Sequence, residues 1–336
     1  MSIRAFISGC ASLSLSSAET EFFSKVNPWG LILYKRNCDS PDQIKSLTSQ
    51  FRAAVKRKDA PVFIDQEGGR VQRLNQPHWR KYPSADVFGK LYSRSPILAL
   101  RSARNAGRLM AEELEELGIT SSCLPVLDVP QPGSHDVIGN RAYGLRPEVV
   151  VALAHAHMAG LMEGGILPVM KHIPGHGRST VDSHHNLPIV KASRAELEGF
   201  DFLPFTALAD CPMAMTAHVV YTALDADNPA TLSRKIIREV IRKTIGFTGL
   251  LMTDDLSMKA LGGSFAEKCE RALNAGCDML LHCGGDMGEM EQVAAAAGPL
   301  GGKAMRRAKQ ALKARRKPLP YDKKAALKDL EASLSA

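Results

Sequence analysis

The sequence has no long apolar stretch. Among its 336 residues, the longest unbroken apolar run, 149–154, has six residues, whereas a membrane-spanning helix needs about 18. Near the N-terminus only residues 5–7 are continuously apolar, which is shorter than the roughly 7–15 residues at the centre of a secretion signal. We therefore expect neither membrane insertion nor export, and hence a cytoplasmic protein.

The sequence also lacks the cysteine patterns of disulfide frameworks and zinc sites. It contains seven cysteines, an odd number, and no pair of them has Cys-x-x-Cys spacing. A large chain with such cysteines is a poor candidate for a disulfide framework, so we expect reduced thiols that are mostly buried. No Gly-x-Gly-x-x-Gly motif follows the first apolar run, which argues against an open sheet that binds dinucleotides.

Positive charge is concentrated near the C-terminus. Residues 303–328 contain eleven Lys and Arg and one acid, a net +10, so the rest of the chain carries −2 of the total +8. Met305, Ala308 and Leu312 recur at helical spacing in this segment. The pattern favours a packed amphipathic helix with a solvated basic face over contact with an anionic surface, and we expect no nucleic-acid partner.

Short apolar runs alternate with helical segments along the chain. The 45% hydrophobic and 23% charged residues are ordinary for a globular protein. Eight runs are continuously apolar, as strands buried on both faces are, and helical sequence follows each. Eight such units predict an α/β fold of one domain, a TIM-type (β/α)8 barrel. The predicted strands are 5–8, 30–34, 62–65, 123–128, 167–172, 213–218, 250–254 and 279–282.

Capping boxes predict where two of the helices begin. One runs from Ser16 to Glu19 and the other from Ser40 to Gln43, the second with Pro41 at the first helical position.

Polar residues follow most of the predicted strands at their carboxyl ends. In a barrel of this type these ends form one rim, where the active site lies, so the side chains should converge on one pocket. One such residue is most simply a helix cap or a loop ion pair, but six strand ends together indicate an enzyme. The residues are Asp65, Asp128, Lys171 with His172, His218, Asp254 with Asp255, and His282.

The densest group of titratable residues lies in segment 171–188. Its glycines and prolines predict an irregular loop, and such a loop on a barrel rim is a candidate lid or catalytic loop. Within it, Asp182 and His184 are two residues apart. An Asp that accepts a hydrogen bond from one imidazole nitrogen leaves the other for proton transfer, so the pair is a candidate general acid/base.

The seventh predicted strand ends in two carboxylates that suit the same chemistry. A glycosidase that retains configuration needs a carboxylate nucleophile and a group that protonates the leaving oxygen and then deprotonates water. Either Asp254 or Asp255 can be the nucleophile, with His184 as the acid/base. Because neighbouring strand residues point to opposite faces, only one of the two aspartates should face the sugar. The periodicity does not decide which.

Four sequence blocks resemble those of a known family. Segment 171–188 contains Lys-His-x-Pro-Gly-His-Gly followed by Asp-Ser-His, and the other blocks are 64–73, 139–144 and 252–258. With them the sequence resembles glycoside hydrolase family 3, in particular its single-domain bacterial β-N-acetylglucosaminidases, over residues 5–300. On this basis we expect residues 1–302 to form the catalytic barrel. Residues 303–336 would be a basic helical extension, packed on the barrel or trailing from it.

The resemblance implies a role for each matched residue. Asp254 would be the nucleophile that forms a glycosyl-enzyme, and His184 the general acid/base, oriented by Asp182. Charged groups that bond strongly to sugar hydroxyls would hold the terminal N-acetylglucosamine: Asp65, Arg73, Arg141, Lys171 and His172.

The resemblance also implies a substrate. It would be a small carbohydrate, a muropeptide in which N-acetylglucosamine is linked β-1,4 to 1,6-anhydro-N-acetylmuramic acid, met in the cytoplasm during cell-wall recycling. No metal or cofactor is implied, and we expect a monomer.

The sequence supports two other enzyme classes less well. The larger two-domain β-glucosidases of the same family lack the Asp-x-His pair that Asp182 and His184 form here. A metal-dependent barrel hydrolase would use the many imidazoles near the rim, but no His-x-His or His-Glu-x-x-His motif stands at a strand end. His155 and His157 are two apart, but they lie in a helical stretch where such side chains diverge.

Overall fold

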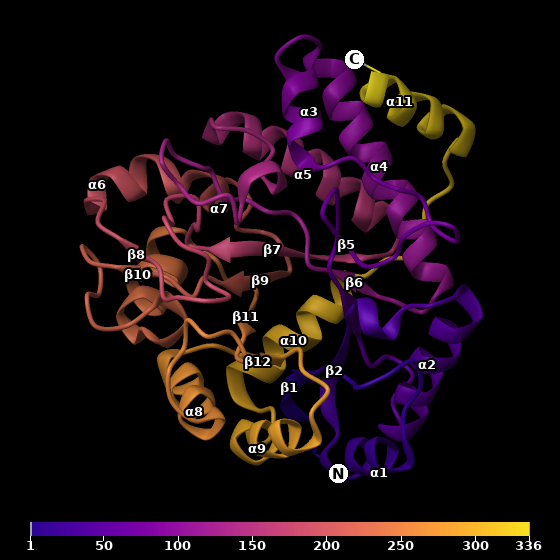
Figure 1. The fold of residues 1–336 in the computed structure, drawn as a ribbon, viewed down its shortest axis with the longest axis vertical. Coiled ribbons are helices and arrows are strands. Elements are labelled where there is room, and N and C mark those ends of the chain that lie inside the picture. The colour runs from indigo at the N-terminus through magenta and orange to yellow at the C-terminus, as the bar shows by residue number, and fades with distance from the viewer. Residues whose placement is uncertain (1, 336) are drawn as a thin grey trace.

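In the computed structural model, which describes residues 2–335, eight parallel strands close into a barrel (Figure 1). The strands follow one another around the barrel in chain order, and the last pairs with the first. The prediction of a TIM-type (β/α)8 barrel is therefore confirmed. The strands are β1 (Arg4–Ser8), β2 (Pro28–Leu33), β3 (Val62–Ile64), β6 (Ser121–Ser122), β7 (Leu167–Ile173), β9 (Met213–Thr216), β11 (Leu250–Asp255) and β12 (Met279–His282).

Helices surround the barrel and connect its strands (Figure 1). Among the described residues no helix is both long enough and apolar enough to cross a bilayer. The α-helices are α1 (Ser17–Val26), α2 (Pro41–Ala54), α3 (Ala85–Tyr92), α4 (Pro96–Glu116), α5 (Pro147–Glu163), α6 (Arg194–Glu196), α7 (Leu203–Ala207), α8 (Phe265–Ala275), α9 (Met287–Ala297), α10 (Gly302–Ala314) and α11 (Lys323–Ser335). The remaining helical segments are η1 (Lys35–Asn37), η2 (Gly139–Arg141), η3 (Leu197–Asp201), η4 (Ala230–Leu232) and η5 (Ile236–Thr244).

The barrel strands bury both of their faces. In β11, Leu250 and Met252 belong to the cluster inside the barrel, whereas Leu251 belongs to the larger cluster between barrel and helices. In β7, Val169 belongs to the cluster inside the barrel and Met170 to the cluster between barrel and helices. Alternate residues of a strand point to opposite faces, so a strand covered on both sides reads as a continuous apolar run.

One of the two predicted capping boxes is present. Ser16 Oγ accepts a hydrogen bond from the Glu19 N–H (3.1 Å), and Glu19 accepts one from the Ser16 N–H (2.8 Å), at the start of α1. The prediction at α2 is wrong: Ser40 precedes the helix, but its side chain makes no capping hydrogen bond. The Gln43 amide instead donates to the main-chain carbonyl of Asn37 (3.1 Å) and secures the preceding turn.

The predicted position of the fourth strand is also wrong. The strand was expected at 123–128, but β6 consists of Ser121 and Ser122. Both serines are buried, and the Ser121 hydroxyl donates to the carbonyl of Leu167 in the next strand (2.8 Å). Two buried serines do not add to a hydrophobic run in the sequence, so the apolar pattern does not reveal this strand. The apolar run that follows contains Pro125, which has no N–H to donate to a strand ladder.

The helix α10 closes the amino end of the barrel. Its residues Ala308 and Ala311 are buried in the cluster inside the barrel. Arg307 donates to the main-chain carbonyl of Thr248 (3.2 Å) and to Asp278 (2.8 Å), which lie just before β11 and β12. The chain therefore covers this end of the barrel with its own helix.

The helix α11 (Lys323–Ser335) packs against α4 (Figure 1). Asp329 forms an ion pair with Arg101 (2.7 Å) and accepts a hydrogen bond from Asn105 (2.8 Å). Lys323 pairs with Glu112 of α4 (2.7 Å). Both helices after residue 302 are thus packed on the rest of the chain. The boundary between residues 302 and 303 as a domain limit stays a prediction.

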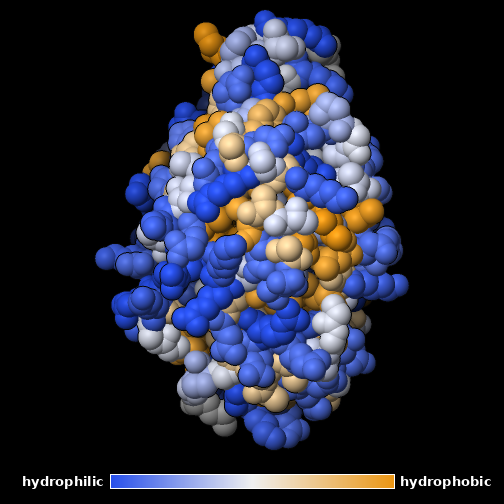
Figure 2. Space-filling view, turned by 90° about the vertical axis from the view of Figure 1, so that its left-hand side faces the viewer, coloured by the Kyte–Doolittle hydropathy of each residue, from blue (hydrophilic) through white to orange (hydrophobic). Residues whose placement is uncertain are grey.

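Two small sheets lie outside the barrel. The antiparallel strands β4 (Gln66–Gly68) and β5 (Val71–Gln72) follow β3, and β8 (Ile189–Val190) pairs with β10 (Val220–Tyr221). On the side of the molecule that carries β8, β10 and α7, apolar residues gather across the middle of the surface (Figure 2). Ile189 and Leu203 are exposed on these elements.

Candidate active site

The carboxyl ends of the barrel strands surround a small cavity of ≈ 170 Å³. Asp182 does not line it but is hydrogen-bonded to His184, which does. The structure therefore brings the eight predicted site residues together at one end of the barrel. The seven that line the cavity are Asp65, Arg73, Arg141, Lys171, His172, His184 and Asp254.

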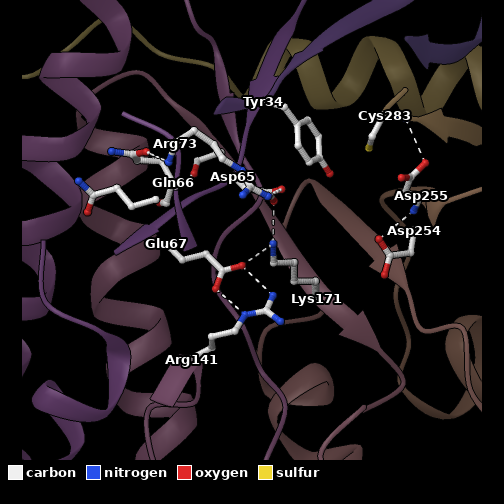
Figure 3. A network of polar contacts seen from close by, with 12 residues as sticks. Tyr34, Asp65, Gln66, Glu67, Arg73, Arg141, Lys171, Asp254, Asp255 and Cys283 are labelled. Carbon is white, nitrogen blue, oxygen red and sulfur yellow. Dashed lines mark hydrogen bonds and ion pairs between the residues drawn. The ribbon is translucent and has the colours of Figure 1, made fainter. Parts of the chain in front are cut away.

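Five charged side chains form one network at the cavity (Figure 3). Lys171 Nζ lies between Asp65 Oδ1 (2.9 Å) and Glu67 Oε1 (2.7 Å). Arg73 pairs with the other oxygen of Asp65 (2.9 Å). Arg141 donates to both oxygens of Glu67 (2.8 Å each). Each acid is thus held between two cations.

The cations keep both acids of this network ionised. Burial alone would raise the pKa of each carboxyl group, but Lys171 and Arg73 hold that of Asp65 well below its usual range. Arg141 and Lys171 lower the pKa of Glu67 to about 2 in the same way. The pKa of Lys171 is raised by Asp65 and Glu67 against the opposing effect of its burial. These charged groups are fixed in place before a ligand arrives, which suits recognition of hydroxyl groups.

The two aspartates that end β11 have different surroundings (Figure 3). Asp255 accepts hydrogen bonds from the N–H groups of Ser257 (3.1 Å) and Cys283 (3.0 Å), and so ties the loop after β11 to the end of β12. Asp254 accepts one from the Asp255 N–H (2.8 Å). Asp255 thus supports the loop, while Asp254 retains acceptor capacity at the cavity.

Asp254 is an ionised carboxylate at neutral pH. Its burial favours the protonated form, but His172, His218 and the hydrogen bond from Asp255 together lower its pKa below the ordinary value. A carboxylate must be deprotonated to act as a nucleophile. The electrostatic surroundings of Asp254 therefore meet this requirement.

Asp128 holds the His172 imidazole and the main-chain N–H groups of His172 and His176. This buried carboxylate lies 2.7 Å from His172 Nδ1 and accepts hydrogen bonds from the N–H groups of His172 (3.2 Å) and His176 (2.6 Å). Burial opposes ionisation, but His172 and these hydrogen bonds lower the pKa of Asp128. An ionised carboxylate can only accept, so Nδ1 of His172 carries the proton.

The Asp182–His184 pair lies on the loop that follows β7. His184 Nδ1 is 2.8 Å from Asp182 Oδ1, which also accepts the His184 N–H (2.9 Å). The His184 side chain is 61% exposed, whereas Ser183 between the two residues is buried and lies 3.1 Å from His176 Nε2. With Nδ1 bonded to the carboxylate, Nε2 of His184 is the nitrogen left for proton transfer.

Three of the predicted strand-end residues do not line the cavity. Asp128 lies behind His172, as described above. His218 lies 2.7 Å from Thr231 Oγ1 and 3.1 Å from the carbonyl of Asp255, and His282 lies 3.0 Å from Glu289. The expectation that all of these side chains converge on one pocket is therefore wrong for these three, which support the strand ends. No group of three or more His, Cys, Asp or Glu side chains within residues 2–335 is arranged to hold a metal ion.

Sequence reasoning missed Glu67 and Tyr34. Glu67 lies in β4 and is separated from Arg141 by 74 residues, so no local pattern connects the two. The only signal was its place beside Asp65 in block 64–73. Tyr34 follows β2, lines the cavity and presents its ring to the guanidinium of Arg73, 4.6 Å away. An aromatic residue at a strand end is too common to mark a site.

Comparisons with known proteins agree on one family. The model of the glycosyl hydrolase family 3 N-terminal domain matches residues 9–313. A beta-hexosaminidase of Alkalilimnicola ehrlichii is 41% identical over 279 residues, which cover 82% of this chain and 79% of that protein. One from Nitrosomonas eutropha is 40% identical over 258 residues, 76% of this chain and 73% of that protein. The solved structure of NagZ from Neisseria gonorrhoeae in complex with N-trifluoroacetyl-D-glucosamine superposes with a TM-score of 0.90 at 30% identity, covering 99% of this chain and 98% of that one.

Proposed function

The chain belongs to glycosyl hydrolase family 3, and from this premise we propose that it is an exo-β-N-acetylglucosaminidase that hydrolyses with net retention of configuration. One observation carries the proposal. Asp254 and His184, the latter with its Asp182 partner, lie at the same small cavity as a preformed network of charged groups. Such a cavity offers a nucleophile, a proton donor and hydrogen-bonding groups for one terminal sugar.

The terminal N-acetylglucosamine would be held by the charged groups at the cavity wall. Their fixed positions favour binding because little side-chain entropy remains to be lost. A cavity of ≈ 170 Å³ is small, which favours removal of an end sugar over cleavage within a chain. The residues assigned to this role are Asp65, Arg73, Arg141, Lys171 and His172.

In the first step, a carboxylate oxygen of Asp254 attacks the anomeric carbon as the glycosidic bond breaks. The imidazolium of His184 gives its Nε2 proton to the departing oxygen. Asp182 stabilises the imidazolium before this transfer and keeps the remaining proton on Nδ1 afterwards. The products of the step are a glycosyl-aspartate and a neutral imidazole.

In the second step, water releases the sugar. The neutral Nε2 of His184 takes a proton from a water molecule whose oxygen attacks the anomeric carbon, and the bond to Asp254 breaks. The sugar leaves as the β-anomer, and the carboxylate and the imidazolium are restored. A neutral imidazole has an advantage here over a second carboxylate, because it places no further negative charge near Asp254.

We further propose that the natural substrate is a muropeptide, N-acetylglucosamine linked to 1,6-anhydro-N-acetylmuramic acid, met in the cytoplasm during cell-wall recycling. The sequence resemblance supports this, and the similar structure from N. gonorrhoeae contains an N-acylated glucosamine. In this proposal the protein acts as a monomer, and residues 1–302 form its catalytic part.

The first test compares two aryl glycosides. We expect kcat/KM for an aryl β-N-acetylglucosaminide to exceed that for the aryl β-glucoside by at least about a hundredfold, because a site that bonds a polar substituent strongly disfavours an analogue without it. Proton NMR during turnover should show the β-anomer of the free sugar first. A preference for the glucoside would refute the sugar assignment, and initial release of the α-anomer would refute the two-step mechanism.

The second test addresses the natural substrate alone. Purified N-acetylglucosaminyl-anhydromuramyl peptide should release free N-acetylglucosamine, detected by mass spectrometry, while internal bonds of long glycan strands stay intact. An enzyme that cleaves the aryl substrate and leaves the muropeptide unchanged would retain its assignment as a hexosaminidase and lose the proposed role in recycling.

A further inference from the structure

The helix that closes the amino end of the barrel carries a row of exposed cations. Because Ala308 and Ala311 of α10 are buried in the barrel, the opposite side of the helix faces away from it. At about 1.5 Å per residue, the row extends over about 15 Å. It consists of Lys303, Arg306, Lys309 and Lys313.

These cations are not neutralised by the chain itself. Their neighbour Arg307 pairs with Asp278 (2.8 Å) and Arg315 approaches Glu115 (3.8 Å), but the four cations of the row form no ion pair within the described residues. Like charges three or four residues apart on a helix repel one another and lower its stability. The row therefore lowers the stability of the helix, and no ion pair within the described residues offsets this repulsion, which is expected of a surface kept for a partner.

The positive surface continues beyond the end of α10. A hollow of ≈ 350 Å³ follows the helix, lined by Lys58, Arg315, Arg316 and Lys317 beside the two acids Asp59 and Glu115. Leu319, two residues further on, is 53% exposed. The basal cationic face is defined here by six exposed residues without ion pairs in the described chain: Lys303, Arg306, Lys309, Lys313, Arg316 and Lys317.

The sequence alone favours a merely solvated basic face over contact with an anionic surface; on the arrangement of the unpaired cations we propose instead that the basal cationic face binds the surface of an anionic phospholipid bilayer. Four to eight clustered Lys and Arg residues are the usual composition of a protein surface that adsorbs to acidic headgroups. Binding of this kind is peripheral and requires no inserted helix. An exposed leucine next to such a cluster suits the boundary between headgroups and acyl chains.

A bilayer fits this face better than a nucleic acid does. Four of the six residues are Lys, whose ammonium group acts as a point charge. Arg is preferred for recognition of nucleic acids, because its guanidinium group can donate two hydrogen bonds to one phosphate. Single strands are bound by stacking on aromatic rings. Tyr321, four residues after Lys317, is already engaged: its hydroxyl donates to Glu112 (2.8 Å) and its ring packs on Arg108.

The geometry leaves the candidate active site accessible in the bound state. The basal cationic face lies at the amino ends of the barrel strands, and the cavity opens at their carboxyl ends. A protein adsorbed through α10 would therefore present its cavity to the solution, away from the lipid. This inference does not depend on the proposed enzymatic activity, because its test measures binding.

The test is sedimentation of the full-length protein with large unilamellar vesicles. The vesicles contain either phosphatidylcholine alone or phosphatidylcholine with 30% phosphatidylglycerol. We expect partitioning to the anionic vesicles only, with a strong decrease between low and high salt, as exposed charges are screened. The variant Lys303→Gln/Arg306→Gln/Lys313→Gln should lose about tenfold or more in partition coefficient.

A matched control removes the same charge elsewhere. Lys45→Gln/Arg234→Gln/Lys235→Gln changes three exposed cations, one in α2 and two just before η5, and it should bind like the parent protein. Hydrolysis of the aryl substrate should be equal in all three proteins, with and without vesicles. The proposal is overturned if anionic vesicles do not bind, if both triple variants lose binding equally, or if duplex or single-stranded RNA competes the protein off the vesicles at stoichiometric amounts.

Discussion

Replacing Glu67 by Gln removes one charge from the centre of the charged network at the candidate active site and keeps the size of the side chain. Glu67 is 4% exposed and accepts hydrogen bonds from Lys171 (2.7 Å) and twice from Arg141 (2.8 Å each). A pKa of about 2, against the ordinary 4.5, corresponds to about 3 kcal/mol of preference for the ionised form in the folded state. Removal of one partner from a buried ion pair typically costs about 3–5 kcal/mol. We therefore expect Glu67→Gln to lower the free energy of unfolding by about 3 kcal/mol.

The same substitution should weaken substrate binding. Lys171 and Arg141 would lose the negative charge that orients them and one of its two acceptor oxygens, which the substitution replaces by an NH2 donor. Hydrogen bonds to charged groups contribute about 1.5–3 kcal/mol each. We expect KM for an aryl β-N-acetylglucosaminide to rise by about 10–100-fold, with a smaller change in kcat, because in the proposed binding mode these groups hold the sugar in the ground state as well as in the transition state. Steady-state kinetics and urea unfolding followed by circular dichroism measure the two effects.

Asp278→Asn is the matched control. Asp278 is also a buried carboxylate between two cations, Arg242 (2.7 Å) and Arg307 (2.8 Å), but it lies at the amino end of the barrel. The Asp278→Asn variant should lose a similar amount of unfolding free energy and keep the kcat and KM of the parent protein. The reasoning is refuted if Glu67→Gln is destabilised with unchanged KM, or if both variants lose activity in proportion to their stability.

The contribution of Glu67 has a defined dependence on pH. Its pKa is lower in the folded protein, about 2, than in the unfolded chain, about 4.5, so the folded state binds its proton more weakly. The stabilisation is complete above pH 4.5 and is lost as the pH falls from 4.5 towards 2. The difference in unfolding free energy between the parent and Glu67→Gln should therefore be largest near neutral pH and shrink across this interval.

Three further substitutions test individual groups of the site. Asp254→Asn should reduce kcat by at least about a thousandfold with an unchanged circular dichroism spectrum, because an amide cannot form the glycosyl intermediate. His184→Ala should slow substrates with poor leaving groups by about 10²–10⁴-fold and activated aryl substrates much less, since good leaving groups need little protonation; equal losses for both would remove His184 from the acid role. Asp128→Asn should raise KM, because the proton on His172 Nδ1 loses its ionised acceptor, and should leave the leaving-group dependence of kcat unchanged.

The barrel could be predicted from the sequence because its strands are covered on both sides. In β7 and β12 the apolar side chains face the barrel interior and the surrounding helices alternately, so each strand is apolar up to the polar residues at its carboxyl end and stands out in the sequence. The prediction failed at β6, where two buried serines donate hydrogen bonds to the carbonyls of Leu167 in β7 and Gln66 in β4. These hydrogen bonds depend on tertiary contacts, which a local sequence pattern does not reveal.

In the candidate site, too, local contacts could be predicted from the sequence, whereas contacts made by the tertiary fold could not. Asp182 and His184 are close in sequence and in space, so their hydrogen bond could be predicted. Glu67 and Arg141 meet only because the barrel brings the loops after β3 and β6 together. Conversely, His218 and His282 occupy strand ends like those of the site, yet they bond to Thr231, Asp255 and Glu289 and support the structure.

A buried carboxylate between two cations occurs at both ends of the barrel, and what differs is access. At the amino end, Asp278 is bonded by Arg242, Arg307 and the Leu251 N–H, and the helix α10, which supplies Arg307, covers it. At the carboxyl end, Glu67 and its cations line an open cavity. A hydroxyl-rich ligand can add hydrogen bonds there without displacing a protein partner, because an ammonium or guanidinium group has more donors than its acids use. The same type of contact therefore stabilises the fold at one end and is suited to bind a sugar at the other.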